Sequence, residues 1–158
     1  METPDEIKIK LSNSKKAYYK KHPEAIEYWF ENTRKNLVMP IKDTKIEVKI
    51  QNVLRRNKIK FDTHKRISNI KYPYQCDILI PSQKGISKTT VIECDGDYWH
   101  GNLSKFKINK LSNRIKAARC LDYERTSQME EKGYNVVRLW KHKINKMDDK
   151  QIVGAIQC

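Results

Sequence analysis

The sequence predicts an α/β domain in which helices cover the faces of a mixed β-sheet. Apolar residues recur at helical spacing in two segments, residues 44–57 and 112–132. Two short apolar runs, residues 75–81 and 89–95, are separated by turn-forming residues and are typical of a β-hairpin. Helical and extended segments follow in the order α-β-β-β-α-β-α, and 158 residues suit one compact domain with a short appendage.

Residues 1–43 differ in composition from the rest of the chain. A basic stretch with two tyrosines comes first, and Pro23 can then begin a helix, followed by a linker around Pro40. We therefore divide the chain into a basic, aromatic extension with its linker, residues 1–43, and an α/β domain, residues 44–158. The apolar face of the expected extension helix consists of Ile26, Trp29 and Phe30.

The α/β domain is expected to begin with a helix over residues 44–57. Thr44 and Glu47 have the spacing of a capping box, in which the two side chains satisfy free backbone N–H groups at a helix start. This local role is the plainest explanation of Glu47, and a supporting role in a functional site stays open. Extended segments are then expected at residues 65–70, 75–81 and 89–95.

The second half of the domain is expected to contain one long helix, one buried strand and a last short helix. The long helix covers residues 112–132, and Gly133 is placed to end it. Residues 134–140 are apolar enough for a buried strand, and residues 148–157 complete the domain.

Charge and composition restrict the possible partners. The chain has 33 Lys and Arg against 19 Asp and Glu, a formal charge of +14, which favours a polyanion such as nucleic acid. A lysine-rich composition from an AT-rich genome is the simple alternative. No apolar run approaches the roughly 20 residues of a membrane helix, and no signal peptide is recognisable, so we expect a soluble, cytoplasmic protein. The four cysteines are scattered, which argues against a disulfide scaffold.

Three acidic residues are placed where a metal ion could use them. Glu93 lies inside an apolar strand, where a charge is costly unless it is paired or coordinated, and Asp95 shares its strand face. Asp77 comes 16 residues before Glu93, at the start of the preceding strand of the hairpin. These carboxylates can converge on one hard cation. For Asp77 alone, a solvated strand-end carboxylate is the simpler interpretation.

A histidine and an aspartate complete the candidate site. His100 lies in a turn between two glycines, five residues beyond Asp95, where it could take a proton from water. Asp122 shares a helix face with apolar residues and so needs a buried partner, which a protonated His100 could provide. For Trp99, core packing and nucleic-acid contact are equally plausible. The other histidines, His22, His64 and His142, have no comparable neighbours in the sequence, and His142 is expected to be exposed.

The run IECDGDYWHGN, with DILIP upstream and GYNVVRLWKHKI downstream, resembles the very short patch repair (Vsr-type) branch of the PD-(D/E)XK nucleases. Within that branch it is most similar to the phage-type homing endonucleases named for their Glu-Asp-x-His-Asp residues. The resemblance covers about residues 44–146 and implies a restriction-endonuclease-like core. It also implies prokaryotic or viral origin. The catalytic residues it implies are Glu47, Asp77, His100 and Asp122.

The resemblance further implies hydrolysis of double-stranded DNA with Mg²⁺, for which Mn²⁺ can substitute. The expected metal ligands are Asp77 with Glu93, Asp95 or a strand carbonyl such as that of Cys94. A homodimer on DNA would allow both strands to be cut. The residues expected to contact DNA are Tyr98, Trp99, Lys105, Lys107, Arg114 and Arg119. The basic segment of residues 12–36 is similar to DNA-binding modules attached to phage-type homing endonucleases.

Two departures from the wider family narrow the expectation. The final lysine of the PD-(D/E)XK pattern is absent, because Cys94 and Asp95 follow Glu93, and in this branch the histidine replaces it in proton transfer. Mismatch-repair members carry a structural zinc with a cysteine near the Trp-His pair, where this chain has Asp97 and Asn102, so no structural zinc is expected. We therefore favour homing-type cleavage over mismatch nicking. A catalytically silent DNA-binding protein on the same fold is the alternative from another class.

Overall fold

The computed structural model describes residues 42–157 without a break, together with Ser14, Ala17, Tyr18, Lys21 and His22. The chain divides into two compact units, Met1–Val38 and Met39–Cys158. The helix expected after Pro23 and the linker around Pro40 lie outside the described residues, so the predictions for residues 1–43 stay predictions. All the strands that the structure describes lie in the second unit.

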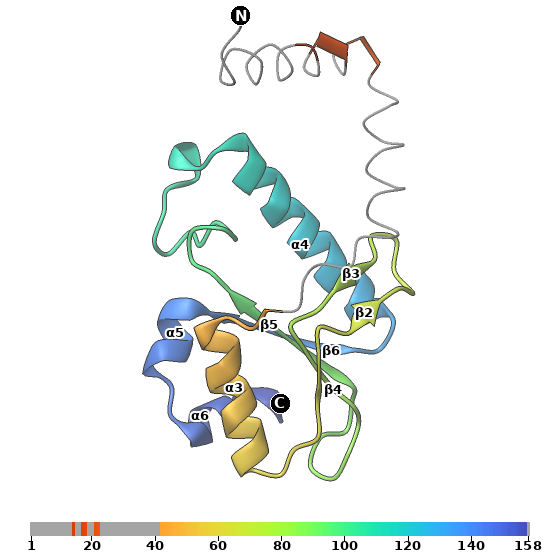
Figure 1. The fold of residues 1–158 in the computed structure, drawn as a ribbon, viewed down its shortest axis with the longest axis vertical. Helices are drawn as coiled ribbons and strands as arrows, with labels where there is room; N and C mark the ends of the chain where they lie inside the picture. Colours follow the sequence, from red (N-terminus) through yellow and green to blue (C-terminus); the bar gives the residue numbers. More distant parts are fainter. Residues whose placement is uncertain (1–13, 15–16, 19–20, 23–41, 158) are drawn as a thin grey trace, which may run out of the picture. The chain divides into compact units, whose positions relative to one another are not determined.

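A four-stranded mixed sheet forms the centre of this unit (Figure 1). Its central strands, β4 and β5, are antiparallel and form the expected hairpin, whereas β5 and β6 run parallel. Two further two-residue strands, β2 (Arg66–Ile67) and β3 (Tyr74–Gln75), pair with each other outside this sheet. In spatial order the sheet contains β1 (Asp62–Thr63), β4 (Ile78–Ile80), β5 (Thr90–Asp95) and β6 (Asn135–Trp140).

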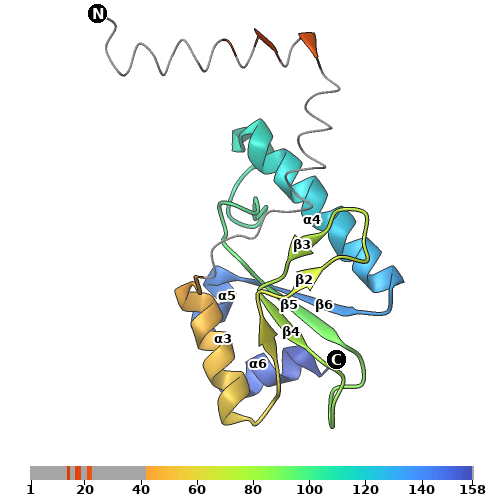
Figure 2. The same cartoon turned by 45° about the vertical axis from the view of Figure 1, so that its right-hand side comes forward.

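Helices lie on both faces of the sheet, as the sequence predicts (Figures 1 and 2). The long helix α4 (Asn113–Glu131) connects the parallel strands and covers one face, after a short 3₁₀ turn at Ile108–Lys110. No helix in the described part of the chain is both long and apolar enough to cross a membrane. The helices of the other face are α3 (Lys45–Arg56), α5 (Lys141–Lys146) and α6 (Asp149–Ile156).

Each face of the sheet has its own apolar core. On the α3 side, Ile50 and Leu54 are fully buried against the strand residues Ile78 and Ile92. On the α4 side, Met129 lies in a smaller cluster of buried residues that includes Val91 and Cys76. Each fully buried aliphatic side chain contributes roughly 1.5–3 kcal/mol, so the larger core supplies most of the stability.

The helix ends follow the sequence signals closely. Thr44 caps α3 by accepting the N–H of Glu47 at 3.4 Å, but its hydroxyl also donates to Glu47 Oε1 at 2.6 Å. Glu47 therefore bonds the cap's side chain, where the expected box has it bond the cap's backbone. At the end of α4, Gly133 has φ 87°, and the N–H groups of Gly133 and Tyr134 donate to the carbonyls of Glu130 and Met129. These two bonds form a Schellman motif, which requires the left-handed conformation that glycine allows.

Two expectations about the elements are wrong in detail. The extended segments 65–70 and 75–81 are each shorter than expected: only Arg66–Ile67 of the first is a strand, and the second passes from the β2–β3 pair at Gln75 to the four-stranded sheet at Ile78. Helix α5 was not expected, since KHKINK has little apolar character. A residue far away in the sequence stabilises this helix: Lys49 Nζ donates to the carbonyls of Ile144 and Met147 at 2.6 and 2.8 Å.

We predict opposite stability effects for two glycine-to-alanine changes. Gly101 has φ 61°, and an added Cβ would lie 3.1 Å from Leu111 Cδ1 and 3.2 Å from Ile115 Cγ2. Gly101→Ala should therefore lower the free energy of unfolding by about 1–2 kcal/mol. Gly154 lies in α6, where an added Cβ meets nothing within 4 Å, so Gly154→Ala should raise it by about 0.5–1 kcal/mol. Urea unfolding measures both, and equal stability of Gly101→Ala and wild type would contradict the prediction.

Candidate active site

A cavity of about 630 Å³ lies where strand β5 ends and helix α3 begins. Because β5 runs parallel to β6 here, the site lies at the carboxyl end of a parallel strand pair, the usual position of ligand sites in such sheets. Lys141 also lines this cavity. Six residues singled out from the sequence line it together: Glu47, Asp77, Glu93, Cys94, Trp99 and His100.

Asp77 is held in the site by the neighbouring strand. Its Oδ2 accepts the backbone N–H of Cys94 at 2.7 Å, and the residue is partly buried, so the solvated strand-end interpretation is wrong. Burial raises the pKa of Asp77 to about 6; the Cys94 N–H opposes this rise, and the negative charges of Glu47 and Asp95 add to it. The ionised form of Asp77 is therefore less stable than that of an ordinary aspartate, and a nearby positive charge would stabilise it.

Glu93 lies deeper than Asp77, on the α4 side of the sheet. Tyr74 donates its hydroxyl to Glu93 Oε1 at 2.7 Å, and the ring of Tyr74 packs 4.5 Å from the guanidinium of Arg125. Burial raises the pKa of Glu93 well above its ordinary value, and the charge of Asp77 raises it further. The charge of Asp77 thus disfavours the ionised form of Glu93.

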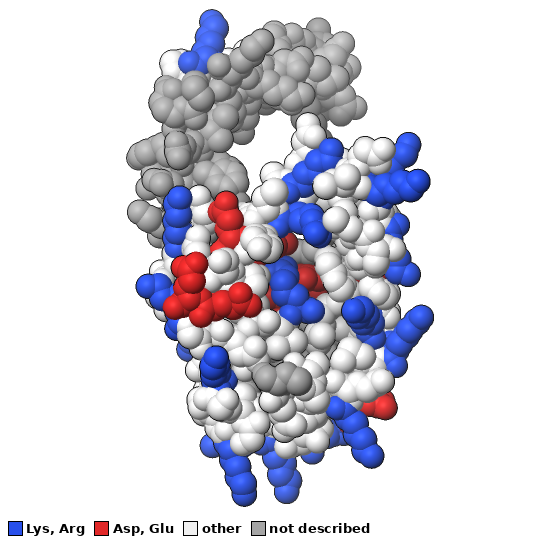
Figure 3. All heavy atoms as spheres, turned by 180° about the vertical axis from the view of Figure 1, so that it is seen from behind, with Lys and Arg blue, Asp and Glu red and all other residues white. Residues whose placement is uncertain are grey.

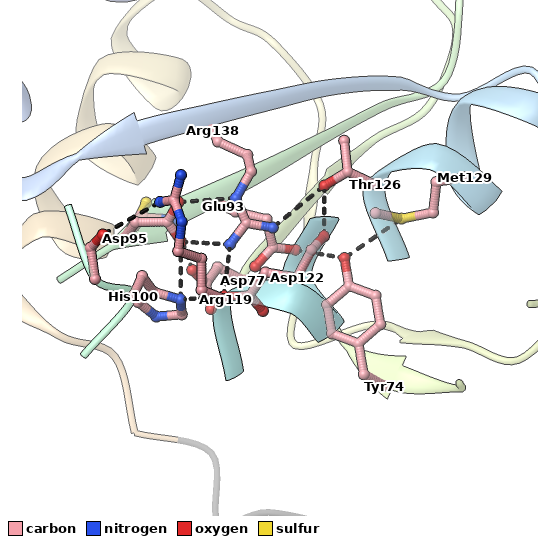
Figure 4. A network of polar contacts seen from close by, with 12 residues as sticks. Tyr74, Asp77, Glu93, Asp95, His100, Arg119, Asp122, Thr126, Met129 and Arg138 are labelled. Carbon is pink, nitrogen blue, oxygen red and sulfur yellow. Dashed lines mark hydrogen bonds and ion pairs between the residues drawn. The ribbon is translucent and has the colours of Figure 1, made fainter. Parts of the chain in front are cut away.

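His100 and Asp122 meet as the sequence suggests (Figure 4). His100 Nδ1 lies 2.7 Å from Asp122 Oδ2 and 3.5 Å from Asp95 Oδ1. Burial lowers the pKa of His100, but the hydrogen bond to Asp122 and the charges of Asp95 and Asp122 outweigh burial and raise the pKa above its ordinary value. Since Nδ1 is held by carboxylates, Nε2 is the ring nitrogen that can exchange a proton with water in the cavity.

Asp95 forms an ion pair with Arg138, a residue that the sequence analysis does not identify. Arg138 Nε and Nη2 donate to the two carboxylate oxygens of Asp95 at 2.8 and 2.7 Å, and Nη2 also lies 3.5 Å from Asp122 Oδ2. Both oxygens of Asp95 are therefore occupied, which favours Asp77 and Glu93 over Asp95 as metal ligands. The sequence does contain one signal for this arginine, because Arg138 is a charged residue inside the apolar run NVVRLW. The structure adds that Arg138 is paired in register with Glu93.

The loop after β5 exposes its aromatic residues. Trp99 is 67% exposed and Tyr98 46% exposed, so core packing of Trp99 is excluded and contact with a partner remains the prediction for both. The rings of Tyr98 and Trp99 meet edge to face at 5.4 Å. The base of the loop is fixed, because Asp97 Oδ1 bonds His142 Nδ1 at 2.6 Å and accepts from the amide of Asn102 at 2.7 Å. The expectation that His142 is exposed is therefore wrong.

The cations expected to contact DNA divide into two groups. Lys105, Lys107 and Arg114 are exposed on the loop and at the start of α4. Arg119 is partly buried and donates to the carbonyl of Gly101 at 3.2 Å, so it supports the His100 loop. On the face shown in Figure 3, basic side chains project around much of the outline, while acidic side chains gather mostly at one side and in a central recess.

Asp43, Glu47 and His64 form a cluster beside the cavity that the sequence does not predict. His64 Nε2 lies 2.8 Å from Asp43 Oδ1 and 4.0 Å from Glu47 Oε2, and only 12% of the His64 side chain is exposed. His64 has no comparable neighbours in the sequence, so its polar partners come from the fold. No local pattern could have shown this cluster, since it joins residues 21 positions apart.

Comparison with known proteins gives no family assignment: no protein-family model matches the chain, and no curated protein is significantly similar to it.

We predict that Arg138→Leu destabilises the protein strongly, because it leaves the buried carboxylate of Asp95 without its partner. The expected loss in the free energy of unfolding is about 3 kcal/mol or more. The double variant Asp95→Asn/Arg138→Leu should lose less than Arg138→Leu alone, because no unpaired charge is left buried. Arg114→Leu, which removes an exposed arginine, should stay within about 0.5 kcal/mol of wild type. Urea unfolding of the three variants tests this, and a double variant less stable than Arg138→Leu would contradict it.

Proposed function

We propose that this chain is a Mg²⁺-dependent DNA endonuclease with a Vsr-like, restriction-endonuclease-type core, and that its cleavage is of the homing type. The observation that carries the proposal is the contact of 2.7 Å between His100 and Asp122 at a cavity that also contains Asp77. A histidine oriented by a carboxylate, next to acidic groups that suit a hard cation, is the arrangement expected for hydrolysis of a phosphodiester.

The acidic residues of the cavity fit Mg²⁺. Asp77 and Glu93 offer carboxylate oxygens, and burial raises the pKa of both, so a divalent cation would relieve an unfavourable concentration of negative charge. Asp77, with Glu93 or the backbone carbonyl of Cys94, would hold the ion. When bound, Mg²⁺ supplies the positive charge that polarises the scissile phosphate and stabilises the leaving oxygen. Mn²⁺ offers the same chemistry.

The protein's own groups handle the proton. His100 Nε2 accepts a proton from the attacking water, while Asp122 holds Nδ1–H and stabilises the imidazolium that forms. Arg138 fixes Asp122 and Asp95 beside the ring, so the ring keeps its orientation. Glu47, at the opposite wall of the cavity, orders water near the metal ligands.

DNA contacts are assigned to exposed groups around the cavity. Lys105, Lys107 and Arg114 neutralise phosphates, which supports affinity without reading sequence. Tyr98 and Trp99 are exposed on an anchored loop, where they can stack on or wedge between bases. Two chains on one DNA site would place one active site on each strand.

The silent DNA-binding alternative explains the basic surface and the exposed aromatic residues equally well. It gives no reason for the partly buried Asp77 to lie beside the buried Glu93, because such carboxylates reduce stability and repel phosphates. A plasmid assay with Mg²⁺ and with EDTA separates the two functions. The enzyme nicks or linearises supercoiled DNA in a saturable, Mg²⁺-dependent manner, whereas the silent protein binds without cleavage at any metal concentration.

We predict that His100→Ala lowers the cleavage rate by about 10²–10⁴-fold, the usual contribution of a general base. Binding to duplex DNA, measured by fluorescence anisotropy, should stay nearly unchanged, because the phosphate contacts are elsewhere. Added imidazole should restore part of the activity of His100→Ala, since the truncation leaves room for a diffusible base. Wild-type cleavage by His100→Ala would show that another group removes the proton.

We also predict a shift in pH dependence for Asp122→Asn. The base must be neutral to act, so the wild-type rate should rise with pH through a His100 pKa that lies above the ordinary histidine value of about 6.5. Asp122→Asn removes a carboxylate that raises this pKa, so the His100 titration should move to lower pH while the maximal rate falls. Ring titration by NMR and the pH–rate profile measure the two effects. An unchanged titration would show that Asp122 does not control the proton affinity of His100.

A further inference from the structure

Asp43, Glu47 and His64 bring three potential metal ligands together beside the cavity. One ligand atom from each residue lies within 4.8 Å of the others. Asp43 precedes the cap of α3, Glu47 lies in the first turn of that helix, and His64 lies in the turn between β1 and β2. The cluster therefore joins two segments that are separate in the chain.

A second observation indicates that this cluster lacks a ligand. Glu47 Oε1 accepts the hydroxyl of Thr44 at 2.6 Å, but Glu47 Oε2 has no hydrogen-bond partner. Among the residues that the structure describes, it is the one buried side-chain oxygen or nitrogen without a partner. The Glu47 side chain is only 6% exposed, and Oε2 lies 4.0 Å from His64 Nε2. A buried carboxylate oxygen in this state is costly unless a cation or a donor completes it.

The backbone and the neighbouring side chains hold the other two ligands in place. His64 has φ 53°, and its N–H donates to the carbonyl of Asp77 at 3.1 Å, which fixes the turn that carries the imidazole. Asp43 Oδ1 accepts from the amide of the buried Gln51 at 2.8 Å. Such outer hydrogen bonds orient metal ligands and are a usual part of a metal site.

We propose that Asp43, Glu47 and His64 form a binding site for a divalent transition-metal cation, separate from the ion at Asp77. One imidazole nitrogen with two carboxylate oxygens suits Zn²⁺ or a neighbouring transition metal better than Mg²⁺, which prefers oxygen ligands. Bonds of about 2.0–2.2 Å place tetrahedral ligands about 3.4 Å apart. The separations of 2.8 and 4.0 Å from His64 Nε2 to Asp43 and Glu47 reach that value with small side-chain movements.

A metal in this site would fasten the start of α3 to the β1–β2 turn. It would also fix Glu47, which lines the cavity of about 630 Å³ together with Asp77. Three protein ligands leave a coordination position for water. The site therefore extends beyond the proposed nuclease chemistry, and its existence does not depend on cleavage.

Isothermal titration calorimetry of the full chain with Zn²⁺ tests the proposal. Wild type should bind one Zn²⁺ at this site and should gain thermal stability when Zn²⁺ is added. Asp43→Asn and His64→Asn should each weaken binding by more than about 10-fold and lose the gain in Tm. Asparagine is chosen at position 64 because it tolerates the left-handed backbone. Circular dichroism and metal-free unfolding curves check that both variants fold.

Matched controls separate this site from other metal ligands in the chain. Cys120→Ser removes an exposed thiol and His22→Ala removes an exposed imidazole, and both should bind Zn²⁺ as wild type does. Asp77→Asn should abolish Mg²⁺-dependent cleavage but keep the Zn²⁺ site, so failure of the nuclease proposal would not be mistaken for failure of this one. The proposal is overturned if wild type binds no Zn²⁺, if Asp43→Asn and His64→Asn bind it normally, or if Cys120→Ser removes it.

Discussion

Arg138 donates to both oxygens of Asp95, and the arrangement of the site depends on this buried ion pair. Asp95 ends strand β5 and Arg138 lies within β6, so the pair joins the two parallel strands at the point where the chain turns toward His100. A buried ion pair contributes little net stability, because desolvation of the two charges offsets their attraction. Its importance here is geometric: Arg138 also approaches Asp122, so one guanidinium fixes both carboxylates that flank the His100 ring.

The acidic residues of the site differ in whether a positively charged side chain pairs with them. Asp95 and Asp122 are balanced by Arg138 and His100, and the positive neighbours of Asp122 lower its pKa although burial alone would raise it. Asp77 and Glu93 form no ion pair among the described residues, and burial raises their pKa values more than the charges of His100 and Arg138 lower them. The strands thus place Asp95 beside Arg138 and His100, and Asp77 and Glu93 at the cavity without an ion pair in the part of the chain that the structure describes. This difference is why the proposed Mg²⁺ is assigned to Asp77 and Glu93.

Local signals predicted much of the fold, and contacts between distant segments explain what was missed. Thr44 and Gly133 mark helix ends because capping depends on neighbouring residues, and the hairpin follows from two apolar runs around Pro81 and Gly85. Helix α5 was missed because Lys49, about 95 positions earlier, completes its end. Residue chemistry alone suggested the pairing of His100 with Asp122. The Asp95–Arg138 pair and the His64 cluster depend on strand register and turn geometry, which the sequence does not state.

The contact of Asp97 with His142 and Asn102 has a consequence for how the protein meets its substrate. It anchors the loop of Tyr98 and Trp99 to the start of α5, because the Asp97 carboxylate bonds the His142 ring and accepts from the His142 backbone N–H and the Asn102 amide. Protein contacts therefore set the shape of the aromatic loop without a bound metal ion. For the proposed nuclease, it follows that DNA can bind to this loop before a metal ion does, so that metal binding would then determine when cleavage begins.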